Sequence, residues 1–375
     1  MPPSIKNTNS IVDALKVCIA KRINFAAYKL PGKDGVTLIV QKDPEIKELG
    51  DISKKLPEKG FLIAPFSHES EKTYLIKPDY ILNDEITPQQ FKEIDALSGI
   101  QGEDRQKTYP DDTLRHDYIK LIEETLLKIN AGEFEKVVLS RVKSIQGDYS
   151  SRLTDIFDIL CDTYKNAFVY LFCIKGQCWI GATPEPFICS KSTELLTVSM
   201  AGTRTFNEKN LDISKWTTKE LQEQEYVTRH IDDVFLKYSV SGYKKEGPYP
   251  VRAGNLLHLR TDFTFSLHAG QANLPSLIHA LHPTPAVCGM SIGKAMDFIK
   301  TAEKHSREYY TGFLGPLGIN DLMQLYVTLR CMKVMNDRLL LYLGGGITIN
   351  SLAEEEWEET EIKAETLLSV IHQIK

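Results

Sequence analysis

The strand-forming segments of this chain come in adjacent groups, and this grouping restricts the fold more than any other feature. Runs rich in β-branched and aromatic residues, bounded by Pro, Gly and Asp, include GVTLIVQ, GFLIAPF and KTYLIKPDYIL near the N-terminus. Further strands are predicted within residues 308–347. A doubly wound fold would alternate strands with helices. The grouping therefore favours large antiparallel β-sheets over a Rossmann fold.

Helical periodicity marks much of the chain between these groups. The segment TLRHDYIKLIEETLLKINAGE reads as a helix that ends at Gly132, and the strand KVVLSRVKSI follows it. The polar stretch GEDRQKTYPDD, residues 102–112, is the candidate seam between an N-terminal part and the rest. Apolar residues at helical spacing predict further helices at about residues 10–21, 150–164, 216–238 and 353–373.

Size and composition exclude several classes of protein. The 375 residues allow two domains or one large one, and 42% apolar with 25% charged residues is ordinary for a globular chain. A net charge of −5 gives no support to nucleic-acid binding. MPPSIKNTNS lacks the pattern of a signal peptide, and no segment approaches the ~20 apolar residues of a membrane span. We expect a soluble cytoplasmic protein that binds neither nucleic acid nor membrane.

The cysteines indicate a reducing compartment. There are seven of them, an odd number, and no C-x-x-C pair occurs. This pattern is typical of free thiols in a cytosolic protein rather than of a disulfide framework or a zinc site. We therefore expect reduced cysteines.

Two pairs of carboxylates stand three residues apart on predicted helices, Glu220 with Glu223 and Glu356 with Glu359. The spacing i, i+3 places both members of a pair on one helical face. Two such faces brought together could supply the oxygen ligands that Mg²⁺ prefers. The surrounding KELQEQEYV and AEEEWEETEIK are acid-rich, and such runs are more often solvated helix faces, so both interpretations stay open.

Lys136, Glu185 and a glycine triplet are the remaining candidates from the residues alone. Lys136 opens the strand KVVLSR and Glu185 lies in the turn GATPEP, where both would be ordinary surface residues unless a cleft encloses them. Within a cleft, burial and neighbouring cations would lower the pKa of a lysine and make it a base. Glycines 344–346 stand inside a strand pattern and indicate a bulge or the close approach of a ligand to the backbone. No nucleotide-binding glycine motif is present.

Nine segments taken together resemble one family, the chorismate-utilising enzymes. They occur in order within about residues 113–372, and any one of them alone would be a modest signal. The family includes isochorismate, salicylate, anthranilate and aminodeoxychorismate synthases. The segments are KVVLSR, GATPE, MAGTR, KELQEQEYV, LHPTPAVCG, EKHSREYYTGFLGPLG, VTLRC, GGGI and EEWEETEIKAETLL.

The resemblance implies an α+β fold in which large, mainly antiparallel β-sheets pack together with helices outside. Residues 1–112 would form an N-terminal α/β subdomain integrated in the fold, and residues 113–375 the chorismate-binding catalytic domain. The implied substrate is chorismate, which the family binds with Mg²⁺. The resemblance also implies a monomer without a glutamine amidotransferase subunit.

The catalytic roles also follow from the resemblance. Lys136 is similar to the general base that deprotonates water for attack at C2 of chorismate, and Glu185 is similar to the general acid that protonates the departing 4-hydroxyl. Such a pair requires a neutral lysine and a protonated glutamate, so each pKa must shift against the charged form.

Metal and substrate contacts are implied in the same way. Glu223 and Glu359 resemble direct Mg²⁺ ligands, with Glu220 and Glu356 supporting the ion through water. The residues that resemble substrate contacts are Gly202, Thr203, His258, Tyr310, Arg330, Gly344, Gly346 and Lys363.

Two positions separate the members of the family. Members that use water carry a lysine at the position of Lys136, whereas ammonia-using anthranilate synthases carry glutamine. Aminodeoxychorismate synthases have a nucleophilic lysine in P-I-K-G-T, where this chain has Ala201 in MAGTR. With LHPTPA, these residues resemble isochorismate synthases of the menaquinone or siderophore type. Salicylate synthase and a non-catalytic binding protein of the same fold are the alternatives.

The chain departs from the family pattern at a few places. Gln224 stands where histidine is frequent, Ser291 stands where proline is common, and the triplet at 344–346 replaces A-G-A-G. None of these changes removes a group that the implied chemistry needs.

Overall fold

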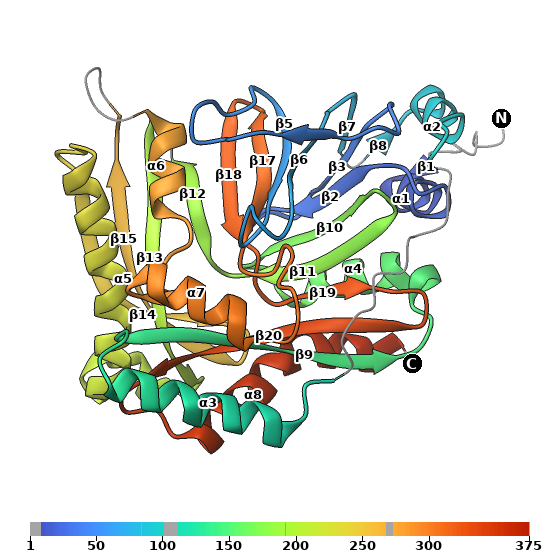
Figure 1. Ribbon diagram of the computed structural model, residues 1–375. Helices are drawn as coiled ribbons and strands as arrows, with labels where there is room; N and C mark the ends of the chain where they lie inside the picture. Colours follow the sequence, from blue (N-terminus) through green and yellow to red (C-terminus); the bar gives the residue numbers. More distant parts are fainter. Residues whose placement is uncertain (1–8, 84, 101–111, 192, 268–272, 375) are drawn as a thin grey trace.

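Two nine-stranded sheets packed face to face form the body of the protein, as the computed structural model shows (Figure 1). The structure describes residues 9–83, 85–100, 112–191, 193–267 and 273–374. All strand pairings in this part of the chain are antiparallel. The predicted α+β fold with large antiparallel sheets is therefore confirmed.

The first sheet carries the strand that begins with Lys136. Its order is β16 (Gly289–Met290), β9 (Lys136–Gln146), β20 (Arg338–Thr348), β19 (Cys331–Val334), β11 (Gln177–Thr183), β10 (Phe168–Ile174), β2 (Phe25–Lys29), β3 (Val36–Val40) and β7 (Tyr80–Asn83).

The second sheet carries the strand that contains Gly202. Its order is β14 (Lys244–Ala253), β15 (Leu256–Phe265), β13 (Glu194–Thr205), β12 (Pro186–Lys191), β18 (Leu322–Val327), β17 (Phe313–Ile319), β5 (Gly60–Ala64), β6 (Thr73–Ile76) and β4 (Lys47–Leu49). A separate short pairing joins β1 (Asn9–Ser10) to β8 (Glu85–Ile86).

Strand β10 shows why these sequences form a layered core. Its residues are buried on both faces, so FVYLFCI lacks the polar alternation of a surface strand. Because successive side chains point to opposite faces, Phe168, Tyr170 and Phe172 pack between the two sheets. Val169 and Leu171 pack on the outer face under the helices.

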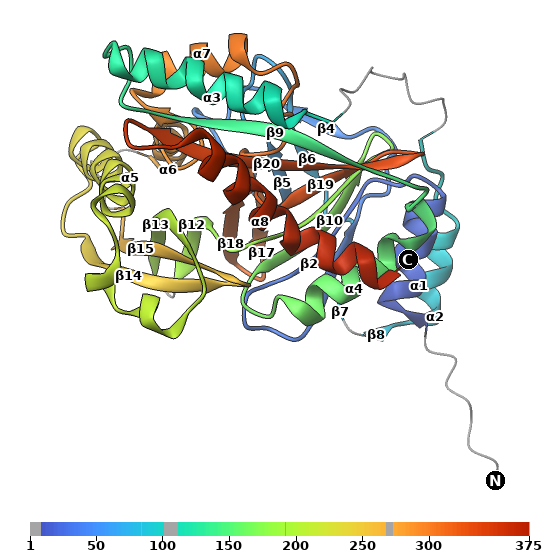
Figure 2. The same cartoon turned by 90° about the horizontal axis from the view of Figure 1, so that it is seen from below.

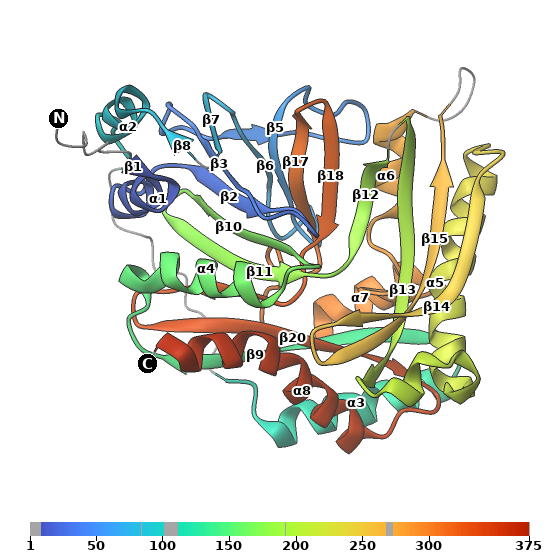
Figure 3. The ribbon, with the colours of Figure 1, turned by 180° about the vertical axis from the view of Figure 1, so that it is seen from behind.

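Helices cover the outer faces of both sheets. Figure 3 shows α4 (Leu153–Thr163) and α8 (Ala353–Ile371) across the first sheet, where they share an apolar cluster with α1 (Ile11–Ala20). Helices α5 (Thr218–Lys237) and α6 (Leu274–Leu281) cover the second sheet. In Figure 2, α3 (Arg115–Asn130) lies beside α8 along β9, and α7 (Ile292–Ala302) packs on the same strand. None of the described helices is long and apolar enough to cross a membrane.

The five helices that periodicity predicted are present, with α5 beginning after the N-cap Thr217. Sequence analysis did not identify α2 (Pro88–Asp95), α6 or α7, because the first two have only eight residues and α7 is followed closely by a loop. The predicted seam at 102–112 lies outside the described residues except for its last position. Strands from the N-terminal part extend both sheets, and the boundary at 112/113 stays a prediction.

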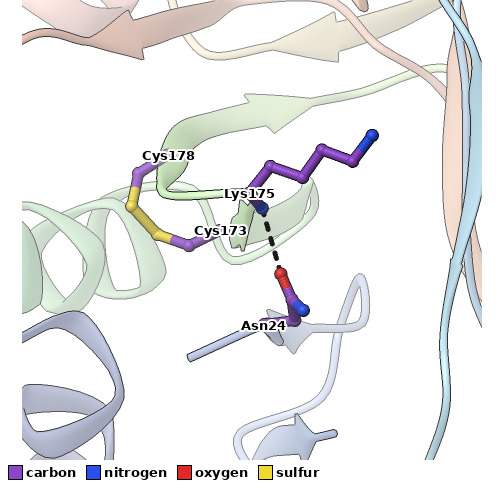
Figure 4. The surroundings of a disulfide bond; sticks show 4 residues. All are labelled: Asn24, Cys173, Lys175 and Cys178. Carbon is purple, nitrogen blue, oxygen red and sulfur yellow. Dashed lines mark hydrogen bonds between the residues drawn. A yellow bond between two sulfur atoms is a disulfide. The ribbon is translucent and has the colours of Figure 1, made fainter. Parts of the chain in front are cut away.

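The expectation of reduced cysteines was wrong for one pair. Cys173 and Cys178 form a disulfide across the hairpin of β10 and β11, with Cα atoms 4.1 Å apart (Figure 4). Lys175 and Gly176 make the two-residue turn with positive φ angles of 50° and 76°, which places the two cysteines directly opposite each other. Spacing alone did not suggest this pairing, because it depends on the turn. The other five cysteines are free and buried.

A buried ion pair between the sheets gives a first prediction about stability. Lys333 Nζ on β19 lies 2.7 Å from Glu308 Oε2, and both side chains are almost completely buried. Lys333→Met would leave the carboxylate without its counter-charge, so we expect a loss of about 3–5 kcal/mol in the free energy of unfolding. The double variant Lys333→Met/Glu308→Leu removes both charges and should recover most of that loss. Urea unfolding of the three proteins measures the difference, and equal losses in both variants would contradict it.

Candidate active site

A cavity of about 90 Å³ lies where β9 and β20 of the first sheet meet β13 and β15 of the second, beneath α5 and α8. Most of the residues that sequence analysis selected line its wall: Glu185, Gly202, Thr203, Glu223, His258, Tyr310, Arg330, Gly344, Gly346 and Lys363. The structure places the other four, Lys136, Glu220, Glu356 and Glu359, behind this wall.

Lys136 is fully buried at the start of β9. Its Nζ lies 3.0 Å from Glu223 Oε1, on the first turns of α5. The contact is an ion pair rather than a hydrogen bond, because the described residues offer Nζ no hydrogen-bond partner of suitable geometry. The surface position that a lysine at a strand start usually has is therefore excluded for Lys136.

Gly346 makes room for this pair. A Cβ atom at Gly346 would stand 2.5 Å from Glu223 Oε1 and 2.9 Å from Lys136 Cε. Gly344, on the same face of β20, similarly allows the Tyr310 hydroxyl to approach, since its Cβ would stand 2.8 Å from that oxygen. These two glycines thus permit the close approach of protein side chains, and the close approach of a ligand stays a prediction.

Glu185 is held in the turn between β11 and β12, and its side chain is buried. Burial raises the pKa of the carboxyl to about 8, although Lys136, Arg260 and Arg330 oppose the shift. Glu185 therefore carries a proton at neutral pH. A protonated carboxyl on a cavity wall can act as a general acid.

A bulge in β13 places backbone groups at the cavity. The register of β13 against β15 shifts between Ala201 and Thr203, and the intervening Gly202 has φ +69°, a conformation that favours glycine. His258 Nδ1 lies 3.1 Å from the Gly202 carbonyl oxygen and donates to it. Burial lowers the pKa of His258 to about 3, with further lowering by Arg330 and Lys363, so the imidazole is neutral.

Gln224 fixes this bulge, and sequence analysis missed that role. Its Oε1 accepts from Ala201 N at 2.9 Å, and its Nε2 donates to Ser199 Oγ at 2.8 Å and to Thr261 Oγ1 at 3.2 Å. The side chain is buried. Because Glu223 is the preceding residue, the amide also fixes α5 relative to the second sheet. The departure from histidine at this position was the only signal in the sequence.

Two cations on the wall can bind carboxylates. Arg330 donates from Nη1 to Thr366 Oγ1 at 3.0 Å, and its Nη2 lies 3.4 Å from His258 Nε2. Lys363 donates to the Gly344 carbonyl oxygen at 2.9 Å. A planar guanidinium suits bidentate binding of a carboxylate, and the two cations together suit a dicarboxylate.

Each of the four predicted metal-site glutamates has a cation of its own. Lys136 faces Glu223, and the remaining pairs are Arg204 Nε with Glu220 Oε1 at 2.7 Å, Lys219 Nζ with Glu356 Oε1 at 2.8 Å and Lys363 Nζ with Glu359 Oε1 at 2.6 Å. In the described part of the chain, no group of His, Cys, Asp or Glu is gathered closely enough to hold a metal ion.

Three of these glutamates, Glu223, Glu356 and Glu359, nonetheless lie near one another and near Lys219. Burial, together with the charge of Glu359, raises the pKa of Glu356 to about 6, so these two carboxylates are close neighbours. Both, and Glu223, act electrostatically on Lys219. Carboxylate oxygens are the ligands that Mg²⁺ prefers.

Glu220 is differently placed. Burial alone would raise its pKa, but hydrogen bonds from Arg204 and Thr217 outweigh this effect and hold the pKa below its usual value. Its carboxylate accepts from the Thr217 backbone N–H at 2.8 Å and so caps α5. This arrangement favours a capping role for Glu220, and its predicted support of a metal stays a prediction.

Comparison with known proteins identifies the family. A family described as chorismate binding enzyme matches residues 69–372, most of the chain. The chain belongs to the chorismate-binding enzyme family. The resemblance found in the sequence is therefore confirmed at the level of the family.

Curated relatives agree with this assignment. Isochorismate synthase MenF of Bacillus subtilis (strain 168) is 28% identical over 264 residues, which are 68% of this chain and 56% of that protein. The vibriobactin-specific isochorismate synthase of Vibrio cholerae is 28% identical over 246 residues, 62% of this chain and 61% of the relative. The matches thus span less than two thirds of these relatives.

Solved structures share the fold. MenF, the menaquinone-specific isochorismate synthase from Escherichia coli, superposes with a TM-score of 0.75 at 22% identity, covering 96% of this chain and 91% of that one. Anthranilate synthase component I from Streptococcus pneumoniae gives 0.66 at 18% identity, covering 92% and 89%.

The close approach at Gly346 gives a second prediction. In Gly346→Ala the new methyl group would displace the flexible ends of Glu223 and Lys136 and leave the backbone in place. We expect a loss of turnover of at least about 10²-fold with nearly unchanged thermal stability. Gly50→Ala is the control, because nothing lies within 4 Å of the position that its Cβ would take. Equal activity of the two variants would contradict the role of Gly346 in leaving room for Glu223 and Lys136.

The pKa of Glu185 gives a third prediction. The unfolded carboxyl ionises near pH 4.5 and the folded one near pH 8, so ionisation favours unfolding increasingly between these values. Glu185→Gln removes this cost. The variant should match the wild type below about pH 4.5 and exceed it by about 5 kcal/mol in free energy of unfolding above pH 8. Urea unfolding at several pH values measures the difference, with Glu123→Gln at an exposed position as the control. A difference between Glu185→Gln and the wild type that stays constant across pH would disprove the assignment.

Proposed function

We propose that this protein is a Mg²⁺-dependent isochorismate synthase, which converts chorismate to isochorismate. The observation that carries the proposal is that buried Lys136 contacts Glu223 of the cavity wall and acts electrostatically on protonated Glu185 of the same wall. Ala201 stands at the position of the nucleophilic lysine of aminodeoxychorismate synthases. A site with a base, an acid and no nucleophilic side chain suits water as the attacking group.

The proposed reaction transfers two protons between water and protein. Lys136 first has to leave its ion pair with Glu223 and give up its own proton. The neutral amine then takes a proton from water as the oxygen bonds to C2. The ring double bonds shift, and the bond from C4 to its hydroxyl breaks. Glu185 gives its proton to the departing hydroxyl, which leaves as water. One water enters and one leaves, so the net change is an isomerisation.

The other predicted residues would hold the substrate. Arg330 and Lys363 bind carboxylate groups, and the backbone at Gly202 and Gly344 contributes hydrogen bonds next to them. Thr203, neutral His258 and Tyr310 line the ring. Bound Mg²⁺ would offset the negative charge of a substrate carboxylate, with Glu223 and Glu359 as its ligands and Glu356 next to them.

Further predictions accompany this proposal. We propose chorismate as the small-molecule partner, and a monomer that works in the cytoplasm without a glutamine amidotransferase subunit, nucleic acid or membrane. We propose menaquinone or siderophore biosynthesis as the use of the product, because two relatives are named menaquinone-specific and vibriobactin-specific isochorismate synthases.

Incubation with chorismate and Mg²⁺ tests the function. We expect isochorismate, resolved by chromatography, and a rate that falls as the pH rises through about 8 and Glu185 loses its proton. Salicylate with pyruvate would instead indicate a salicylate synthase. No Mg²⁺-dependent turnover would indicate a binding protein of this fold.

Variants of the proposed acid and base sharpen the test. Lys136→Gln keeps a polar side chain but removes the base, so isochorismate formation should fall by 10²-fold or more, and Glu185→Gln should lose a similar factor. Substrate affinity should be nearly unchanged in both, because neither residue is proposed to bind a carboxylate. Lys165→Gln, in a surface pair with Asp162, is the control. Near wild-type turnover in Lys136→Gln would exclude it as the base.

A further inference from the structure

Lys219 connects the two helices that carry the acidic pairs. It lies in the first turn of α5, and its Nζ donates to Glu356 Oε1 of α8 at 2.8 Å. The Glu356 side chain is only 2% exposed, whereas that of Lys219 is 27% exposed. Lys219 is therefore the cation that compensates the most deeply buried carboxylate of the group.

The surroundings of Lys219 are acidic on more than one side. Glu359 and Glu223 also act electrostatically on its ammonium, in addition to Glu356. Behind Glu356 stands β20, where a Cβ at Gly345 would be 3.2 Å from Glu356 Oε2. The ammonium thus occupies the space in front of carboxylates that are otherwise the natural ligands of a divalent cation.

The charges around this point balance without a metal. Three carboxylates, on Glu223, Glu356 and Glu359, face three ammonium groups, on Lys136, Lys219 and Lys363. A divalent ion that entered alone would add two positive charges to a balanced, largely buried group. Each nearby ammonium opposes such an ion by Coulomb repulsion.

We propose that Lys219 is an internal counter-ion that competes with the divalent cation for the carboxylates and lowers the affinity of the site for it. The inference rests on the proposed function, because it concerns the metal of that site. Lys219 is a positioning residue: it holds Glu356 in place when no metal is bound. It keeps the dication from binding tightly before a dianionic substrate supplies the balancing charge.

Metal titration without substrate tests this role. Mn²⁺ is the probe, followed by its effect on water proton relaxation, with Mg²⁺ as the competitor. Lys219→Gln keeps a hydrogen-bond donor for Glu356 but removes the charge, and it should bind Mn²⁺ roughly tenfold more tightly than the wild type. Lys219→Met should show the same direction, and thermal unfolding without metal should occur at a lower temperature in both variants.

Two further variants separate charge from other effects. Lys219→Arg keeps the positive charge and should bind Mn²⁺ with nearly wild-type affinity. Lys245 of β14 pairs with Asp232 of α5, away from the cavity. Lys245→Met should therefore leave the affinity for Mn²⁺ unchanged. If Lys245→Met bound Mn²⁺ as tightly as Lys219→Gln does, the gain in affinity would come from the net charge of the protein alone. That result would overturn the proposal.

The remaining outcomes distinguish this inference from the proposed function. Unchanged or weaker Mn²⁺ binding in Lys219→Gln, with measurable binding in the wild type, overturns the role of Lys219 and leaves the metal site intact. No saturable binding in the wild type, or full binding retained in Glu223→Gln, overturns the metal site itself and this inference with it.

Discussion

The register of β9 against β20 is the constraint on which the site depends. In this pairing Lys136 stands opposite Thr348, and Val138 stands opposite Gly346. Because side chains alternate across a strand, a slip by one residue would turn Lys136 away from Gly346 and from the cavity. The first seven residues of β9 are buried, and this burial specifies one register, so the position of the lysine follows from the packing of the strand.

Charge compensation is the second condition that the structure meets. Buried ions are costly unless an opposite charge is adjacent, and Glu223, Glu356 and Glu359 each pair with a lysine. Glu185 differs, because it holds a proton and so carries no buried negative charge. A site built from paired charges can accept a dication and a dianion together without a change in its net charge. This property agrees with the chemistry of the family to which the chain belongs.

The two sheets contribute different residues to the cavity. The first sheet supplies Lys136 and the glycines of β20, and the second supplies the bulge at Gly202 with His258 beside it. Helix α5 joins them, since Glu223 reaches the first sheet while Gln224 binds the second. The position of Lys136 relative to the backbone at Gly202 therefore depends on the packing of α5 against the second sheet.

Sequence alone determined the class of fold, because grouped strands and helical periodicity are local properties that survive in the tertiary structure. Most of the residues that it selected lie on the cavity wall, but they were selected through resemblance of nine motifs. Taken singly, Lys136, Glu185 and the acidic pairs were indistinguishable from surface residues. Only the tertiary structure decided which glutamate faces which cation, that Glu220 caps its own helix, that Gln224 binds the backbone of β13 and that Lys219 pairs with Glu356. It also decided the pairing of Cys173 with Cys178, through a turn that spacing did not reveal. Burial, charge pairing and pKa depend on neighbours that are distant in the sequence, and such neighbours exist only once the sheets have packed.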